Sequence, residues 1–473
     1  MKKNYLYLAY VILMLPIIFP NHFFGQTKDS KKVDDLFEQW NKPNSAGVAI
    51  SVVRDGKVIY QKGFGTAVLE NNVPITPKTI FQSASVSKQF TAFAVLLLAN
   101  QGKLKLEDDV RKYLSEVPDF GKTITIRHLL NHTSGLRDQA ELAAVAGVRL
   151  DDVLTQGQVL KIVQRQKELN FTPGEEIVYC NTGYTLLAEI VARVSGKSFR
   201  QFTEENILKP LEMSNTHFHD DYVMVVPNRA SSYFQIGEGR FIYLPSNNSH
   251  VGATNLMTTA EDFAKWLNNF ESGKVGGKTL IAQMQETGYL NNGNKTDYGA
   301  GFDLETYRGL NTISHGGGDA GFRSFMIYFP KQKFGVAILS NLGNFVGRDI
   351  AKKIADIYLE RELKPQSTEN NQPQKSANSV TFQISNEKLN EYLGDYYSEE
   401  LDTTYKIVFK DGNLIVQHFR NDDVSLNAVS ADKFSAEVWW FKSVLFTRDG
   451  KGNIEGFRLS TFRGVRNLKF VKR

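Results

Sequence analysis

The sequence predicts an α+β fold: an antiparallel sheet flanked by helices, with a helical subdomain, followed by a small all-β domain of barrel-like type. Three observations lead to this fold class. Strand-like patterns occur at both ends of a long helical middle, which suggests that the terminal strands share one sheet. A polar stretch, residues 364–379, then interrupts the pattern. After it, only strand-like hairpins follow.

The first elements of the larger part are a hairpin and a buried helix. Within residues 46–65, apolar residues alternate with others on both sides of Asp55-Gly56, which is a strong signal for a two-residue β-turn. Residues 88–100 are apolar almost all round. Gly102 follows them, as expected where a buried helix ends.

A later helix and a second hairpin complete the larger part. Residues 258–270 have a helical pattern and open with Thr258 and Glu261, which have the spacing of a capping box. Residues 322–341 contain two apolar runs on either side of Pro330, and they predict two neighbouring strands joined by a turn.

The tail has the pattern of a separate all-β domain. Residues 381–473 contain hairpins with Asp-Gly turns and no long helical pattern, which indicates a small barrel or sandwich. The predicted boundaries are therefore a main domain at 26–362, a polar linker at 363–380 and the tail at 381–473. No internal repeat is evident.

Residues 1–25 have the layout of a secretory signal. Lys2 and Lys3 precede an apolar run, and small and polar residues follow it. An uncleaved membrane anchor is the alternative, but Pro16 and Pro20 weaken a continuous helix and favour cleavage. We therefore expect a periplasmic or secreted protein with no stable membrane insertion once the signal is removed.

Composition excludes several classes of function. The 473 residues are 41% hydrophobic and 23% charged, as in globular proteins, and the net charge of +5 is too small to indicate a nucleic-acid partner. Cys180 is the only cysteine, so neither an intramolecular disulfide nor a thiolate metal cluster can form. The eight histidines show no metal-ligand spacing, and we expect no metal or other cofactor.

Ser85 and Lys88 are the first candidate site residues. If a helix begins near Ser85, Lys88 lies one turn further on the same face, where its amine can reach the serine hydroxyl. A desolvated lysine can take the proton that serine must lose to become a nucleophile. The same spacing recurs at residues 385–388 and 430–433, so the pair alone does not establish a site. A serine that only caps the helix is the structural alternative.

Tyr179 and Asn181 form a second constellation before a predicted helix. The phenol can transfer a proton and the amide can hold a substrate carbonyl. Residues 289–291 repeat the Tyr-x-Asn pattern, and a tyrosine packed under a loop is the alternative.

His315, Gly317 and Gly318 form a third constellation, between two strand-like runs. Glycines at a strand edge let a substrate lie against the backbone, and a free N–H there can serve as half of an oxyanion hole. Residues 250–252 repeat His-x-Gly, but no comparable strand follows them.

The order of these motifs resembles that of the serine β-lactamase and penicillin-binding-protein superfamily, in particular the class C β-lactamase-related serine hydrolases. The stretches "LLNHTSGL", "TPGEEIVYCNTGY", "ILKPLEMSNTHF" and "YGAGF" strengthen the resemblance, which covers residues 34–358. Ser134 lies in the first of these stretches, lacks a base at helical spacing and is not expected to be the nucleophile. The tail looks like the lipocalin-like modules of some members.

The resemblance implies roles for the candidate residues. Ser85 would be the nucleophile, Lys88 and Tyr179 the proton-transfer pair, and Asn181 would orient the substrate amide. The backbone N–H groups of Ser85 and Gly318 would hold the oxyanion. His315 stands where β-lactamases of this group usually carry lysine, and a mostly neutral histidine predicts weak β-lactam hydrolysis.

The resemblance also implies a function: a serine hydrolase that acts through an acyl-enzyme on amide or ester bonds. Its substrates would be small molecules or peptides, such as D-amino-acid peptides, esters or weakly hydrolysed β-lactams. D-alanyl carboxypeptidases, D-aminopeptidases and esterases all belong to the group. The alternative is a penicillin-binding sensor or scaffold that is acylated but not turned over. The sequence does not indicate an oligomeric state.

Overall fold

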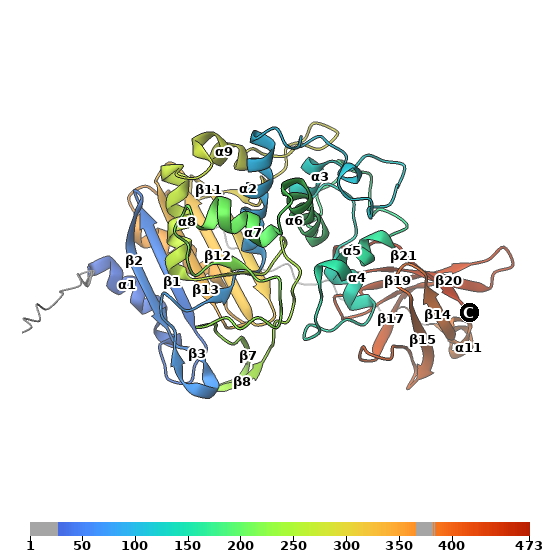
Figure 1. The fold of residues 1–473 in the computed structure, drawn as a ribbon. Helices are drawn as coiled ribbons and strands as arrows, with labels where there is room; N and C mark the ends of the chain where they lie inside the picture. Colours follow the sequence, from blue (N-terminus) through green and yellow to red (C-terminus); the bar gives the residue numbers. More distant parts are fainter. Residues whose placement is uncertain (1–26, 366–381, 383) are drawn as a thin grey trace, which may run out of the picture.

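A central antiparallel sheet joins the two ends of the main domain. The computed structural model describes residues 27–365, 382 and 384–473. Its six-stranded sheet has the order β10-β11-β12-β13-β1-β2, so strands from the start of the domain pair with strands from its end (Figure 1). This confirms the predicted α+β class with terminal strands in one sheet. The strands are β1 (Val48–Arg54), β2 (Lys57–Phe64), β10 (Asp303–Tyr307), β11 (Leu310–Asp319), β12 (Phe322–Phe329) and β13 (Phe334–Ser340).

Both predicted hairpins of the main domain are present. Strands β1 and β2 turn at Asp55 and Gly56, which both have positive φ, at 50° and 73°. Glycine adopts this conformation without the strain that a Cβ brings. Strands β12 and β13 are joined across Pro330, as the two apolar runs predict.

The sheet separates two hydrophobic cores, because successive side chains of a strand point to opposite faces. Ala49 and Val53 of β1 belong to one core, which also includes Phe263 and Leu267 of α8. The other core includes Ile50 and Ile350, and it lies under α1 and α10. The helices of the main domain are α1 (Lys28–Leu36), α2 (Ser87–Asn100), α3 (Ile126–Leu130), α4 (Gln139–Val145), α5 (Gln156–Gln164), α6 (Asn181–Ser195), α7 (Phe199–Thr203), α8 (Ala260–Ser272), α9 (Gly277–Met284) and α10 (Gly347–Tyr358).

Helix α2 is buried on nearly every side, as its apolar sequence predicts. It ends at Asn100, and Gly102 follows with φ 70°. Short strands complete the domain, namely β3 (Thr66–Val68), β4 (Val73–Pro74), β5 (Phe81–Gln82), β6 (His217–Phe218), β7 (Tyr233–Gly237), β8 (Arg240–Tyr243) and β9 (Leu256–Thr258).

The start of α8 corrects one prediction. Thr259 caps the helix and accepts from the N–H of Asp262, whereas the sequence suggested Thr258 with Glu261. The two threonines are adjacent, and both have an acidic residue three positions later. Thr258 is unavailable as the cap because it is the last residue of β9, where it pairs with Phe81.

The tail forms a closed antiparallel barrel, which confirms the predicted all-β domain. Tyr405, Phe446 and Phe457 are among the aromatic side chains that fill it. A short helix, α11 (Asn386–Leu389), precedes the barrel. The strands are β14 (Gly394–Ser398), β15 (Thr403–Lys410), β16 (Asn413–Gln417), β17 (Val424–Ser430), β18 (Lys433–Ser435), β19 (Ser443–Arg448), β20 (Ile454–Ser460) and β21 (Leu468–Lys472).

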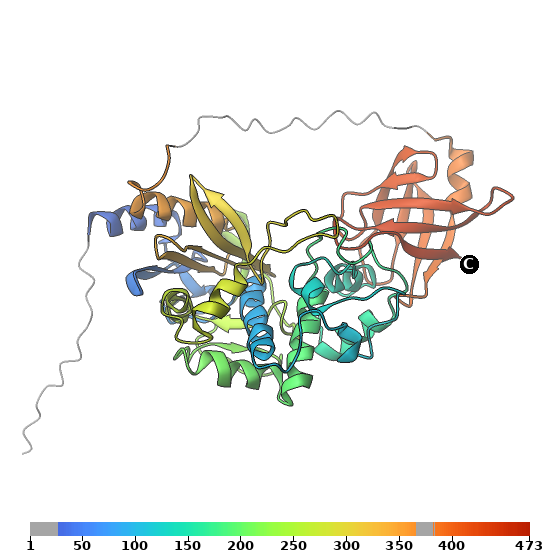
Figure 2. The same ribbon diagram turned by 90° about the horizontal axis from the view of Figure 1, so that it is seen from above.

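The barrel packs closely against the helical subdomain. Figures 1 and 2 both place α4 and α5 between the sheet and the barrel. Leu142 and Val145 of α4 pack into the barrel's own core. The buried Arg137 donates to Glu400 of the barrel at 2.5 Å, and both side chains are at most 6% exposed. The two domains therefore share a buried interface.

The predicted signal and the predicted linker lie largely outside the described residues, but the start of the linker can be compared with the structure. The end of the signal and the end of the linker therefore stay predictions. Leu363 was assigned to the linker, but it packs into the main-domain core, and the Lys364 N–H donates to Arg308 O at 2.9 Å. The main domain thus continues beyond residue 362. None of the helices in the described parts of the chain is apolar and long enough to cross a bilayer.

Candidate active site

Ser85 lies in a tight turn at the entrance of α2. It is the middle residue of a 3₁₀ turn, Ala84–Val86, and α2 starts at Ser87. Ala84 has φ 47°, a strained conformation for a residue with a Cβ. The Ser87 hydroxyl holds the turn, because it donates to Ala84 O at 2.5 Å and accepts from Leu256 N at 3.0 Å.

Lys88 lies beneath Ser85 and is fully buried. Its Nζ donates to Ser85 Oγ at 3.1 Å, to Asn181 Oδ1 at 2.9 Å and to Ala253 O at 2.8 Å. Burial lowers the pKa of Lys88 from 10.5 to about 7, because a charged amine loses its hydration there. A neutral amine that can accept the serine proton is therefore well populated at neutral pH.

Tyr179 lies beside this pair, in the segment that leads into α6. Its ring is 4.7 Å from Lys88 Nζ, and the His132 ring packs against it with centroids 4.3 Å apart. Among the described residues, its buried hydroxyl has no partner with full hydrogen-bond geometry, although the Ser85 hydroxyl lies near enough to affect its pKa. Burial raises the pKa of Tyr179 well above its ordinary value, and the Ser85 hydroxyl offsets only part of this rise. The phenol is thus protonated at neutral pH.

Asn181 is the first residue of α6 and is held at both ends of its amide. Its Oδ1 accepts from Lys88, and its Nδ2 donates to Asp138 Oδ2 at 3.0 Å. The backbone N–H of Asn181 donates to the same carboxylate oxygen at 2.6 Å. Sequence reasoning missed Asp138, whose only visible signal was that of a helix cap at the start of α4.

His315 lies on β11 and faces the same cavity, but both its ring nitrogens have partners. Nδ1 is 2.6 Å from Gly316 O, so it must donate, and Nε2 then accepts from the Tyr298 hydroxyl at 3.0 Å. Burial and the charge of Lys88 lower the pKa of His315 to about 3. The histidine is neutral across the physiological range, as expected, and its predicted contact with substrate stays a prediction.

The glycines after His315 bring β11 against the serine turn. A Cβ on Gly317 would lie 2.3 Å from Ser324 Oγ and 2.4 Å from Ser83 O, so no larger residue fits. The sequence suggested that glycine leaves room for substrate here. The structure gives another reason at Gly317, which is the close approach of two protein segments. Gly318 follows on the same strand and lines the cavity.

The predicted residues converge on one cavity of about 1240 Å³. Lys88 lies beneath it, against Ser85, and the others line it: Ser85, Tyr179, Asn181, His315, Gly317 and Gly318.

The rival motif copies do not form a second constellation. Ser385 caps the short α11, and Lys433 begins β18 of the barrel. Tyr289 is 60% exposed, and Ser134 is buried away from the cavity lining. His250 lines the cavity, but its Nδ1 lies 3.2 Å from Leu154 O.

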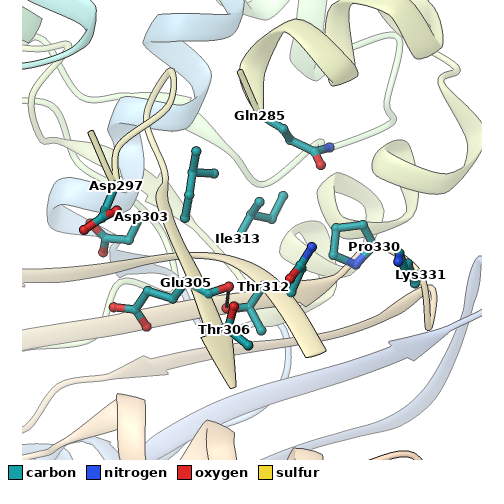
Figure 3. A pocket seen from close by; sticks show the side chains of 11 residues that line it. Gln285, Asp297, Asp303, Glu305, Thr306, Thr312, Ile313, Pro330 and Lys331 are labelled. Carbon is teal, nitrogen blue, oxygen red and sulfur yellow. Dashed lines mark hydrogen bonds between the residues drawn. The ribbon is translucent and has the colours of Figure 1, made fainter. Parts of the chain in front are cut away.

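A second hollow, of about 810 Å³, lies at the β10–β11 edge of the sheet. Figure 3 shows its carboxylates, Asp297, Asp303 and Glu305, with Lys331 at the far end. None of the predicted site residues lines it. Within the described ranges, no group of three or more His, Cys, Asp and Glu residues is arranged to hold a metal ion.

The family comparison agrees with the order of the motifs. The β-lactamase family matches residues 33–359. The chain belongs to this family. Protein flp of Staphylococcus aureus (strain MRSA252) is 30% identical over 333 residues, which are 67% of this chain and 64% of that protein. The chain thus spans less than two thirds of this relative's length.

Several solved structures resemble this one. An octameric penicillin-binding protein homologue from Pyrococcus abyssi has a TM-score of 0.63 and 23% identity, with 94% of this chain and all of that chain covered. A D-amino acid amidase from Ochrobactrum anthropi SV3 has a TM-score of 0.59 and 20% identity, with 71% of this chain and 99% of that chain covered. At these identities the likeness establishes the fold.

Proposed function

We propose that the chain is a serine hydrolase that forms an acyl-enzyme on Ser85 and releases it with water. The observation that carries this proposal is the 3.1 Å contact between Lys88 Nζ and Ser85 Oγ at the cavity floor. A serine hydroxyl becomes a nucleophile when a neighbouring base takes its proton, and a buried amine with a lowered pKa is such a base. Membership of the β-lactamase family supports the same chemistry.

The protonation states suggest how Lys88 and Tyr179 divide the proton transfer. Lys88 is about half neutral at pH 7, whereas Tyr179 is protonated, so we assign Lys88 as the acceptor of the Ser85 proton. Tyr179 then donates to the leaving group and is reprotonated from Lys88. Asn181 keeps the amine in place through its 2.9 Å contact.

The oxyanion of the tetrahedral intermediate would lie between the 3₁₀ turn Ala84–Val86 and β11. We assign its donors to the backbone N–H groups of Ser85 and Gly318, which come from the two segments that Gly317 brings together. Attack of water on the acyl-enzyme, by the reverse proton route, restores Ser85. The route requires no metal or organic cofactor.

The proposed substrates are amide or ester bonds in D-amino-acid peptides, short esters and, more slowly, β-lactams. The large cavity supports a peptide-sized substrate, and the likeness to a D-amino acid amidase supports amide hydrolysis. A neutral His315 attracts a β-lactam carboxylate less than a lysine would, which supports slow β-lactam turnover.

A fluorophosphonate probe and a chromogenic ester together test this function. We expect steady ester turnover by the full chain and a probe adduct on the Ser85 peptide, with no labelling of a Ser85→Ala variant. Ser134→Ala is the matched control, and it should still be labelled. Undiminished labelling of the Ser85 variant would refute the assignment. A single stoichiometric burst without turnover would favour the sensor or scaffold alternative.

We further propose export of the chain, on the basis of the leader-like residues 1–25. N-terminal sequencing of the exported protein should then begin close to residue 26. An intact N-terminus in a membrane fraction would indicate the uncleaved anchor.

A further inference from the structure

The barrel supplies part of the wall of the Ser85 cavity. Trp439, Trp440 and Arg463 of the barrel line it together with Ser85 and Tyr179 of the main domain. Arg463 lies in the connection between β20 and β21, and its Cζ is 5.5 Å from the centroid of the Tyr179 ring. Arg463 is far from Tyr179 in the sequence but lies against its ring, and Tyr179 is a residue that we assign to proton transfer.

The connection that carries Arg463 is anchored to the main domain. Gly464 O accepts from Asp138 N at 2.8 Å, and Gly464 N donates to Glu141 Oε2 at 2.7 Å. A Cβ on Gly464 would lie 2.6 Å from the Asp138 Cβ, so the backbone approach requires glycine. Asn170 adds a further contact, since its Nδ2 donates to Gly464 O at 3.0 Å. These bonds hold Arg463 at the cavity wall.

Arg463 is an exposed residue. Within residues 27–365 and 384–473 its side chain forms no ion pair or hydrogen bond, and it lies over the face of the Tyr179 ring. Other cavity arginines are engaged: Arg149 pairs with Asp151, Arg348 with Glu305 and Arg420 with Asp152, and Arg323 donates to backbone carbonyls. An anion that enters beside Tyr179 therefore meets a guanidinium that no carboxylate of the described residues pairs with directly.

We propose that Arg463 binds an anionic group on the leaving-group side of the substrate, so that the barrel sets a preference for such substrates. The inference rests on the proposed function, in which Tyr179 protonates the leaving group. The planar guanidinium suits the two oxygens of a carboxylate or a phosphate. Because the site is exposed, salt should weaken the preference.

Matched thioesters test the proposal with the full chain. S-acetyl thioglycolate and S-acetyl thioglycolamide differ only in whether the leaving group carries a carboxylate or a neutral amide. S-acetyl 2-mercaptoethyl phosphate and S-acetyl 2-mercaptoethanol form the corresponding phosphate pair. Thiol release, followed with a chromogenic thiol reagent, gives kcat/KM for each substrate. For each variant, kcat/KM of the anionic substrate is divided by kcat/KM of its neutral partner. A change in the chemical step that affects both substrates equally then cancels from this ratio.

We expect Arg463→Gln to lower the anionic-to-neutral ratio about tenfold for at least one pair, whereas Arg463→Lys retains most of it. Arg458→Gln is the control, because it removes the same charge from a barrel arginine that pairs with Glu168 outside the cavity lining. The pair that responds identifies the ligand as a carboxylate or a phosphate. Ratios that Arg463→Gln leaves unchanged in both pairs would overturn the inference but not the proposed function. A wild-type chain that hydrolyses the chromogenic ester but none of the thioesters would also overturn the inference but not the proposed function.

Discussion

The pH profile of acylation follows from the burial of Lys88. The fall in its pKa from 10.5 to about 7 corresponds to about 5 kcal/mol, at about 1.4 kcal/mol per pH unit, by which the site disfavours the charged amine. If neutral Lys88 takes the Ser85 proton, the active fraction is about one tenth at pH 6, half at pH 7 and nine tenths at pH 8. The value of kcat/KM for a neutral ester should therefore rise about tenfold between pH 6 and 8 and then level off.

Asp303, which also lines the cavity, has a pKa that burial raises to about 6, at the lower edge of this window. The pKa of His315 is about 3, and burial holds the pKa of Tyr179 well above 10. The profile is measured with an uncharged ester, because kcat/KM then reports groups of the free protein. A rate that continues to rise tenfold per pH unit to pH 9 would show that Lys88 keeps an ordinary pKa. A flat profile between pH 6 and 8 would show that neutral Lys88 is not required.

Two substitutions should move this profile in opposite directions. The carboxylate of Asp138 raises the pKa of Lys88 against the larger lowering by burial, and the charge of Arg463 lowers it. Asp138→Asn keeps a side-chain oxygen that can accept from Asn181 but removes the negative charge. The pKa of Lys88 should then fall, and the rising limb of the profile should shift to lower pH. Arg463→Gln removes a positive charge, so the pKa of Lys88 should rise and the rising limb should shift to higher pH. Shifts in the same direction would contradict this electrostatic account.

Three further predictions concern stability. Gly317→Ala should lower the free energy of unfolding by about 2–3 kcal/mol in thermal or denaturant unfolding, because its Cβ would overlap Ser83 O. Gly316→Ala is the control and should cost less than about 1 kcal/mol, because its Cβ would be 3.6 Å from its nearest neighbour. Equal effects of the two substitutions would contradict the packing argument. Glu400→Gln should cost about 3 kcal/mol, because it removes the buried charge at 2.5 Å from Arg137 and leaves that arginine only the half-exposed Glu168 as an ion-pair partner, at 3.4 Å. Glu399→Gln, at an exposed ion pair, should cost less than about 1 kcal/mol. A chain that stops after residue 365 should have a lower Tm than the full chain and should aggregate more, because it exposes the side of α4 that faces the barrel. An unchanged Tm would show that the interface between the two domains adds no stability.

The sequence was sufficient to predict the elements that local patterns determine. The Asp55-Gly56 turn, the apolar α2 and the paired runs about Pro330 each follow from residues close together in the chain, and each is present. The candidate site residues were found by the order of three short motifs, and the cavity brings them together. At α8 two adjacent threonines fit the capping pattern equally, and only the pairing of Thr258 in β9 decides between them.

Contacts between distant segments could not be predicted in this way. No pattern around Asp138 distinguishes a simple helix cap from a carboxylate that also holds Asn181. The protonation state of His315 depends on its burial and on its hydrogen bond with Tyr298, and the sequence alone reveals neither. The polar linker suggested two independent domains, but docking depends on complementary surfaces that only the folded chain forms.

The position of Asp138 links the barrel to the proposed chemistry. Its backbone N–H donates to Gly464 of the barrel, and its carboxylate accepts from Asn181, which in turn holds Lys88. Arg463 precedes Gly464 and adds a positive charge near the same amine. Removal of the barrel would therefore change both the support of Asn181 and the pKa of Lys88, even if the sheet and α2 remained folded. The barrel is on this reasoning a part of the proposed active site and not only an attached module.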